Sequence, residues 1–268
     1  MRKKRDSRLR LNNDGQDEMP MDNTTRRSTL CLAGALICGG TLGALMPRGP
    51  FMKALIGSAS AATIPPAARL PFTVSRGGSE IGRHVVSFVR DRSGDGERLT
   101  VDIEIDLSVS FAFITAYEYR HRNREIWVDG RLVSMETTTD DNGDSFFVTA
   151  QANGDSIRVE STSGSYEAPS TAIPSSYWNR AFLDRDRIIN TQDGRFMPVS
   201  IEGRTDETIR AAGRDIAATR YDIGGLAPLS IWYSGAGQWV KLAFDAQGSE
   251  VSYLLNAGAG GASTLADG

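Results

Sequence analysis

Cysteine is absent from the chain beyond residue 62, and this absence removes several kinds of chemistry. The 2 cysteines, Cys31 and Cys38, both lie in an N-terminal segment that differs in composition from the rest. Without thiols, residues 63–268 have no cysteine nucleophile, no thiolate metal ligand and no disulfide. Their stability must come from a hydrophobic core, and they are numerous enough to build one in a single domain.

Histidine is almost as scarce, and basic residues are outnumbered by acidic ones. The only 2 histidines, His84 and His121, exclude a zinc site with three histidine ligands. Residues 1–62 hold 10 of the 30 basic and 5 of the 33 acidic residues, which leaves residues 63–268 with a net charge of −8. Such a surface repels nucleic acid and anionic lipid. We therefore expect no nucleic-acid partner.

Catalytic signatures are also lacking. Residues 63–268 contain no Gly-x-Ser-x-Gly elbow, no P-loop and no dinucleotide fingerprint. Acidic residues are frequent, but their spacing selects no pair suited to glycoside hydrolysis. We therefore expect no catalytic residue, no cofactor and no metal.

A twin-arginine motif lies in the N-terminal segment. Arg26 and Arg27 directly precede an apolar stretch, Leu30–Met46, and this arrangement is typical of the signal read by the twin-arginine export machinery. A small-x-small cleavage site follows at 59–61. We therefore expect residues 1–62 to be an export leader and the mature protein to be periplasmic. The alternative is an uncleaved leader that anchors the protein in the membrane.

Strict alternation of apolar and polar residues gives the clearest structural signal. From Leu99 to Val109, every second residue is aliphatic and the residues between them are polar or acidic. This period of two predicts a β-strand with one buried and one solvated face. A helix would distribute the same aliphatic residues around its whole circumference.

Similar short segments recur along the chain, separated by turn residues. Dipeptides such as Asp129-Gly130 accept the positive φ of tight hairpin turns. We therefore predict an all-β, mainly antiparallel domain over residues 63–255, a curved up-and-down sheet or barrel of about ten strands. Residues 161–186 interrupt the pattern, and we predict a short helix near residues 175–183 that covers the sheet. The small, Gly-rich segment 256–268 is predicted to be a disordered tail.

Several fragments resemble a family of exported β-rich proteins of unknown function from Gram-negative bacteria that carry a twin-arginine signal. The fragments are IGRHVVSF, YEYRHRNREIWVDGRLV, DDNG, SYWN, IWYSGAGQWVKLAF and VSYLL. Ser234 stands where that family tends to have Asp. The resemblance implies a β-rich periplasmic domain, with a fold like the curved half-barrel of lipoprotein carriers, and it implies no activity.

Aromatic residues within these fragments form the candidate binding site. Core packing explains most of them, because a tryptophan buries a large area. A pocket with apolar walls and few polar groups would instead suit a lipid-like ligand. The expected function is binding or carrying an apolar small molecule or lipid, or a structural role in the envelope. The candidate ligand-binding residues are Trp127, Trp178, Asn179, Trp232 and Tyr233.

Two weaker candidates remain. His121 is interpreted as a half-exposed strand histidine; the alternative is a hydrolase of unknown class in which Glu125 or Asp129 orients it as a base. The residues Asp140, Asp141, Asn142 and Asp144 resemble part of a calcium loop, but they lack its conserved glycine and glutamate positions, so a hairpin turn is the preferred interpretation. Nothing in the sequence specifies an oligomeric state.

Overall fold

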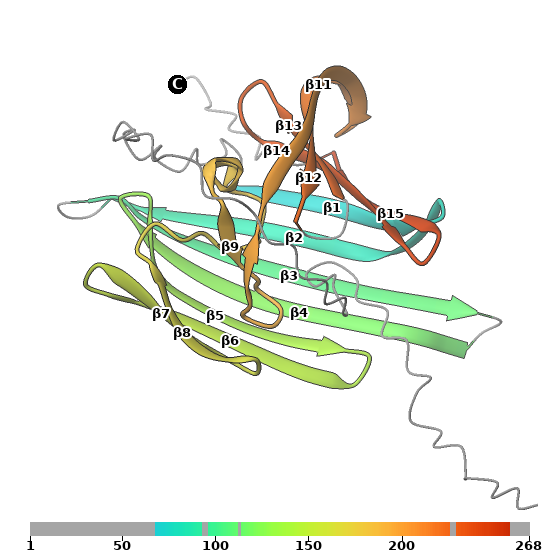
Figure 1. Ribbon diagram of the computed structural model, residues 1–268. Helices are drawn as coiled ribbons and strands as arrows, with labels where there is room; N and C mark the ends of the chain where they lie inside the picture. Colours follow the sequence, from blue (N-terminus) through green and yellow to red (C-terminus); the bar gives the residue numbers. More distant parts are fainter. Residues whose placement is uncertain (1–67, 93–95, 112–113, 226–228, 258–268) are drawn as a thin grey trace, which may run out of the picture.

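The computed structural model describes residues 68–92, 96–111, 114–225 and 229–257, which form mostly antiparallel strands (Figure 1). The predicted leader lies outside these ranges, and so does nearly all of the predicted tail. Within them, no helix is long and apolar enough to cross a bilayer. The strands of the main sheet are β1 (Arg69–Arg76), β2 (Ser79–Asp91), β3 (Arg98–Phe111), β4 (Ile114–Val128), β5 (Arg131–Asp141), β6 (Asp144–Asn153), β7 (Ser156–Ser161), β8 (Gly164–Pro169), β11 (Ser200–Ala211), β12 (Arg214–Gly224), β13 (Leu229–Ser234), β14 (Trp239–Ala246) and β15 (Ser249–Leu255).

These 13 strands form one curved sheet in the order β11-β12-β13-β14-β15-β1-β2-β3-β4-β5-β6-β7-β8. Every pair of neighbours is antiparallel, and nearly every pair is also consecutive in sequence. The exception joins the two ends of the chain, since β1 pairs with β15 and places Phe72 opposite Leu255. Strands β8 and β11 are the edges of the sheet. The predicted all-β, up-and-down antiparallel architecture is thereby confirmed.

The sheet has more strands than the ten or so predicted. Strand β8 (GSYEAP) lies in a segment that showed no alternation, because only one of its side chains, Ala168, is buried. The segment RFMPVSIE is divided between the short strand β10 (Phe196–Pro198) and the long edge strand β11. Both differences arise where exposed strands carry little hydrophobic pattern.

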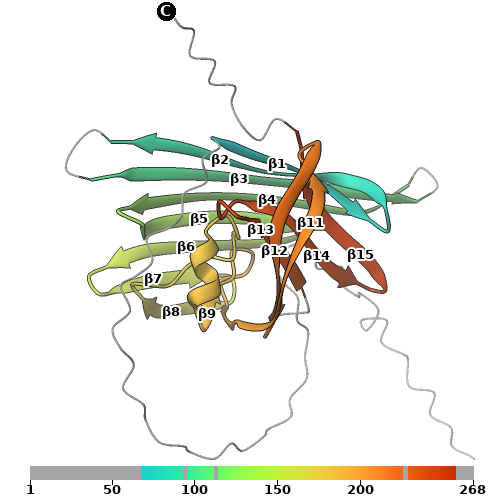
Figure 2. The same cartoon turned by 90° about the horizontal axis from the view of Figure 1, so that it is seen from above.

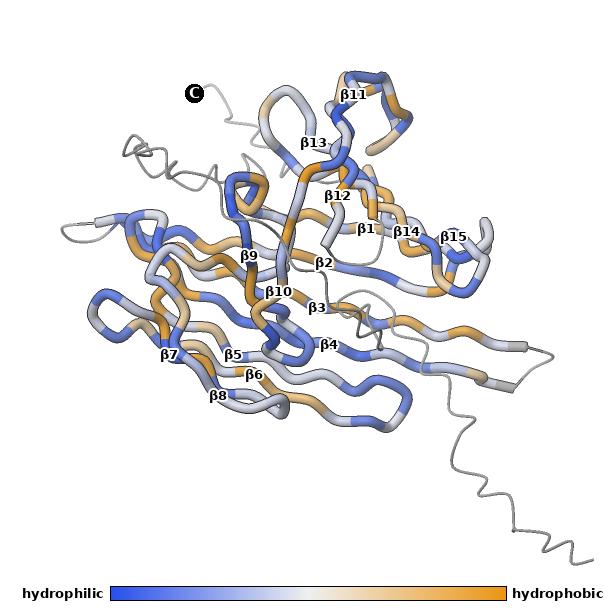
Figure 3. Tube along the Cα trace, viewed as in Figure 1, coloured by the Kyte–Doolittle hydropathy of each residue, from blue (hydrophilic) through white to orange (hydrophobic). Residues whose placement is uncertain are grey.

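Strand β3 has the predicted two faces. Its inward residues Ile103 and Ile105 are each 3% exposed. On the outer face, Asp102 and Asp106 pair with Arg124 and Arg122 of β4, each at 2.7 Å. Polar and apolar positions interleave along the strands in Figure 3, as a sheet with one buried face requires.

The chain between β8 and β11 does not join the sheet. Residues 170–199, called the plug below, contain the 3-10 helix η2 (Arg180–Asp184) and the hairpin β9 (Arg187–Ile189) and β10. Figure 2 shows the plug in front of the sheet and beside β11 and β12. Most of its apolar side chains belong to the same core cluster as those of the sheet. The plug therefore covers the sheet, as predicted for this segment.

The helix within the plug begins later than predicted. We expected it near residues 175–183, whereas η2 starts at Arg180. Tyr177 has a φ of 64°, which a right-handed helix does not accommodate. The Asn179 side chain then caps η2 by accepting a hydrogen bond from the Ala181 backbone N–H at 3.1 Å.

Candidate functional site

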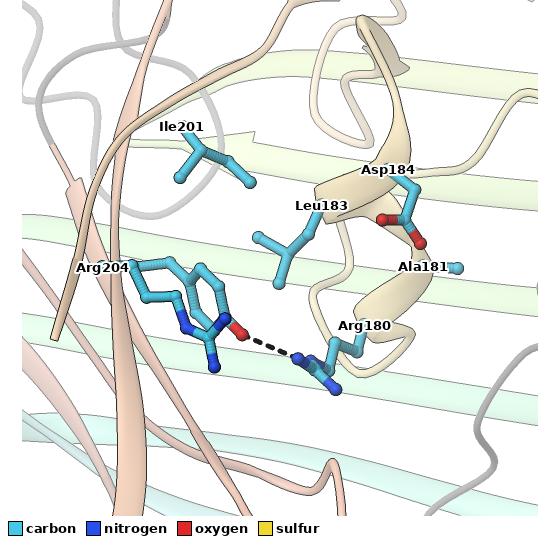
Figure 4. Close-up of a pocket in the computed structure, with 7 residues that line it drawn as sticks. Arg180, Ala181, Leu183, Asp184, Ile201 and Arg204 are labelled. Carbon is cyan, nitrogen blue, oxygen red and sulfur yellow. Dashed lines mark hydrogen bonds between the residues drawn. The ribbon is translucent and has the colours of Figure 1, made fainter. Parts of the chain in front are cut away.

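A pocket lies where the plug meets the edge of the sheet, between η2 and the hairpin β11–β12. It has a volume of about 380 Å³. Figure 4 shows that Arg180 and Leu183 of η2 extend toward the hairpin that carries Ile201 and Arg204. We call it the seam pocket, and its lining residues are Arg180, Ala181, Leu183, Asp184, Ile201, Arg204 and Tyr221.

Tyr221 organises the polar end of the seam pocket. Nη2 of Arg180 donates to the Tyr221 hydroxyl oxygen at 2.6 Å. The guanidinium carbons of Arg180 and Arg204 lie 5.6 and 5.9 Å from the centroid of the Tyr221 ring. Arg204 reaches this ring because it is directly opposite Tyr221 in the β11–β12 ladder. The buried Tyr221 thus contacts two cations, Arg180 from η2 and Arg204 from β11.

Aliphatic side chains form the other wall. Leu183 of η2 is half-buried against the core, and Ile201 of β11 remains 45% exposed. Ala181 completes this wall from the first turn of η2. The seam pocket therefore places three aliphatic side chains beside two cations, and most of its lining surface is polar.

A buried carboxylate fastens the plug to the sheet. Glu125 of β4 accepts hydrogen bonds from the Asn123 amide and from the indole N–H groups of Trp127 and Trp178, each at 2.9 Å. Burial raises the pKa of the Glu125 carboxyl, and the hydrogen bonds from the two indoles oppose that shift. Since Trp178 belongs to the plug, this carboxylate joins two distant parts of the chain.

A second polar contact attaches the plug further along β4 and β5. The Gln192 side-chain amide donates to Asp141 at 3.2 Å, and its carbonyl oxygen accepts from the Tyr119 hydroxyl at 3.2 Å. The Tyr117 hydroxyl also donates to Asp141, at 2.6 Å. These buried groups satisfy one another, so they hold the plug in one register.

The predicted ligand-binding residues lie on both faces of the sheet. Trp127 and Trp178 pack edge to face at 5.3 Å, and Asn179 caps η2 beside them. The Tyr233 hydroxyl donates to the Tyr177 carbonyl of the plug at 2.6 Å. These four residues therefore lie at the contact between plug and sheet.

Trp232 is separated from this group. Its cross-strand neighbours are Arg220 and Lys241, whose charged groups lie 5.4 and 4.5 Å from the centroid of the Trp232 rings. Its indole N–H donates to Glu207 at 2.5 Å. Consecutive strand residues point to opposite sides, so Trp232 lies on the outer face, opposite to Tyr233. Its neighbours there cover it and leave it only 5% exposed.

His121 is buried rather than half-exposed, with 2% of its surface accessible. Its Nδ1 lies 2.8 Å from the Thr139 hydroxyl. Burial lowers the pKa of His121 to about 4, and burial together with the proximity of His121 lowers the pKa of His84 to about 3. Both imidazoles are therefore neutral at pH 7.

The acids considered as partners of His121 have other contacts. Glu125 bonds the two tryptophans, and Asp129 accepts a hydrogen bond from the Glu97 backbone N–H at 3.1 Å. The sequence Asp140–Gly143 forms the expected hairpin turn, closed by a hydrogen bond from the Gly143 N–H to Asp140 at 2.8 Å. Across the described ranges, no group of three or more His, Cys, Asp or Glu residues could hold a metal ion.

The sequence analysis missed the residues of the seam pocket. Arg180 follows the SYWN fragment directly, but Arg204 and Tyr221 lie in strands whose exposed arginines resemble many others in the chain. Only the pairing of β11 with β12 and the position of η2 bring the three together.

Residues 72–256 match the family described as a domain of unknown function, DUF6134, so the chain belongs to that family. Among solved structures, the chain is similar to the beta-barrel-like protein of the domain of unknown function DUF1849 from Brucella abortus. The identity is 8% and the TM-score 0.49, over 74% of this chain and 97% of that chain. No curated protein matches the chain.

Proposed function

We propose that this member of the DUF6134 family is an exported, periplasmic protein that binds or carries an apolar small molecule or a lipid without catalysing a reaction. The seam pocket is the observation that carries the proposal. Its volume, about 380 Å³, is within the range of small-molecule sites. It also lies beside β11, an edge of the sheet, where a ligand can enter without opening the strand ladder.

The contact between plug and sheet supports binding rather than hydrolysis. His121 is buried, its pKa is lowered and its partner is Thr139. A general base needs access to a substrate proton and a pKa near the working pH. The buried aromatic residues instead pack the plug against the sheet. This packing holds η2, one wall of the seam pocket, in position.

The experiment that tests ligand binding is recovery of the full chain from the periplasm of an expressing Gram-negative host. Lipids extracted from the purified protein are identified and quantified by mass spectrometry. We expect close to one amphiphile per chain in the wild type. The variant Ile201→Asp places a carboxylate in the apolar wall and should lose most of it, whereas Val89→Asp, at another exposed strand position, should not.

Two results would contradict the proposal. Either the wild type carries no amphiphile and binds none when vesicle lipids are supplied, or Ile201→Asp retains full occupancy while both variants keep the wild-type melting temperature. In the first case, the structural role in the envelope becomes the better explanation.

Export is tested separately. Replacing Arg26 and Arg27 by lysine should retain the protein in the cytoplasm, because the export receptor reads the arginine pair itself. Arg48→Lys, outside the motif, is the control. Periplasmic recovery of the double variant at the wild-type level would contradict twin-arginine export.

A further inference from the structure

Two arginines that form no ion pair with any described residue line the seam pocket. Arg180 and Arg204 both lie over the Tyr221 ring, at 5.6 and 5.9 Å. Two like charges that contact the same ring repel each other, and a protein tolerates them best where an anion can neutralise both. Their arrangement is unexpected in a chain whose residues 63–268 carry a net charge of −8.

Neither guanidinium has an acidic partner among the residues that the structure describes. Ten ion pairs occur there, and they involve other arginines, such as Arg122 with Asp106 and Arg124 with Asp102. Asp184 lines the same pocket, yet its carboxylate forms no ion pair with either cation. Within the described ranges, the Arg180 side chain donates to the Tyr221 hydroxyl oxygen and to no carboxylate. The donors of the two arginines are therefore available to a ligand.

Tyr221 adds a third donor. Its hydroxyl oxygen accepts from Arg180, so its own proton remains free to be donated toward the pocket. Two guanidiniums and one hydroxyl can then surround an anion with several oxygen atoms. Forked guanidinium groups are the donors best matched to carboxylate and phosphate oxygens.

We infer that the seam pocket binds the acidic head group of an amphiphile, a carboxylate or a phosphate monoester, through Arg180, Arg204 and Tyr221. The alkyl chain of the ligand lies against Leu183 and Ile201. This inference rests on the proposed function, since it specifies the class of ligand that the same pocket takes.

The overall negative charge does not prevent such binding. Charges more than about 8 Å away are largely screened at physiological ionic strength, whereas the arginine pair contacts the ligand directly. The surrounding acids would instead disfavour binding to an anionic membrane surface. The pocket is thus suited to a single acidic molecule rather than to a charged bilayer.

Calorimetric titration of the delipidated mature protein with a matched set of ligands tests the inference. The ligands are dodecanoate, dodecyl phosphate and 1-dodecanol, each below its aggregation concentration, together with acetate and inorganic phosphate. We expect both acidic amphiphiles to bind at least about tenfold more tightly than the alcohol. The tighter of the two identifies the head group as carboxylate or phosphate.

Three variants assign the effect to the pocket. The double variant Arg180→Gln, Arg204→Gln should bind the acidic amphiphiles only as weakly as the alcohol, and Tyr221→Phe should weaken them about threefold, by loss of one hydrogen bond. Arg214→Gln, an exposed arginine on the same hairpin, should bind like the wild type. Equal melting temperatures show that the double variant is folded.

The possible failures are distinguishable. If the alcohol binds as tightly as the acids, or if the double variant retains the preference for acids, the inference is overturned and the proposed function stands. If inorganic phosphate binds as tightly as dodecyl phosphate, the site binds an anion, but the alkyl chain contributes nothing and the claim that the ligand is an amphiphile is disproved. If no ligand binds the wild type, both are overturned.

Discussion

The indole N–H of Trp178 donates to the Glu125 carboxylate at 2.9 Å, although 53 residues separate the two in sequence. The same oxygen accepts the indole N–H of Trp127, and both acceptor and donors are buried. This contact attaches the plug to the inner face of the sheet. It therefore also fixes η2, which forms one wall of the seam pocket.

Replacing Glu125 with leucine should destabilise the protein strongly. Three N–H groups would lose their acceptor, at a cost of about 1 kcal/mol or more for each, so we expect the free energy of unfolding to fall by at least about 3 kcal/mol. Urea titration measures this change. Glu104→Gln, an exposed acid on β3, is the control and should change stability by less than about 0.5 kcal/mol. A Glu125→Leu variant of wild-type stability would show that the plug does not depend on this contact.

Acid should destabilise the protein through its buried histidines. The folded-state pKa values of His84 and His121, about 3 and about 4, lie below the unfolded value of 6.5. The unfolded state therefore binds more protons below pH 6.5, and stability falls as pH decreases from there. Each histidine should account for a loss of about 2 kcal/mol between pH 7.5 and 5.

His84→Phe provides the direct measurement of this effect. His84 packs against Phe72, Trp239 and Tyr253, and neither ring nitrogen has a hydrogen-bond partner among the described residues. Phenylalanine should fit among these rings, so the variant should be at least as stable as the wild type at pH 7.5. It should lose about 2 kcal/mol less on acidification to pH 5. Parallel pH curves for the two proteins would argue against proton uptake at His84.

Ile103→Asp should prevent folding. Ile103 is 3% exposed and lies in the middle of β3, so the substitution buries a carboxylate with no cation beside it. Circular dichroism should show loss of the β spectrum. Glu104→Lys, on the outer face of the same strand, should fold normally. A soluble Ile103→Asp variant with the wild-type melting temperature would refute the assignment of faces.

Trp232→Phe should leave ligand binding unchanged. The substitution removes the hydrogen bond to Glu207 and weakens the contacts with Arg220 and Lys241, all of them on the outer face. We expect a stability loss of about 1 kcal/mol and an affinity for amphiphiles within about twofold of the wild type. Tyr233→Phe, which frees the Tyr177 carbonyl of the plug, is the informative comparison. A much larger loss of affinity for Trp232→Phe than for Tyr233→Phe would place the ligand on the outer face.

Local patterns in the sequence determined the class of fold. Residues of β3 alternate so regularly that the strand, its buried face and its solvated face follow from the pleat alone. Turn dipeptides such as Asp129-Gly130 mark hairpins for the same reason, because the required φ values restrict which residues fit. The opposite orientations of Trp232 and Tyr233 could also have been read from their adjacency in a strand.

Tertiary structure alone decided how the two ends of the chain meet and where the plug lies. The pairing of β1 with β15 and the contact between Trp178 and Glu125 join residues far apart in sequence, and neither leaves a periodic signal. The seam pocket depends in the same way on η2, β11 and β12. A strand shows its own faces through local chemistry, but the residue that a side chain contacts across the core is selected by the packing of the whole molecule.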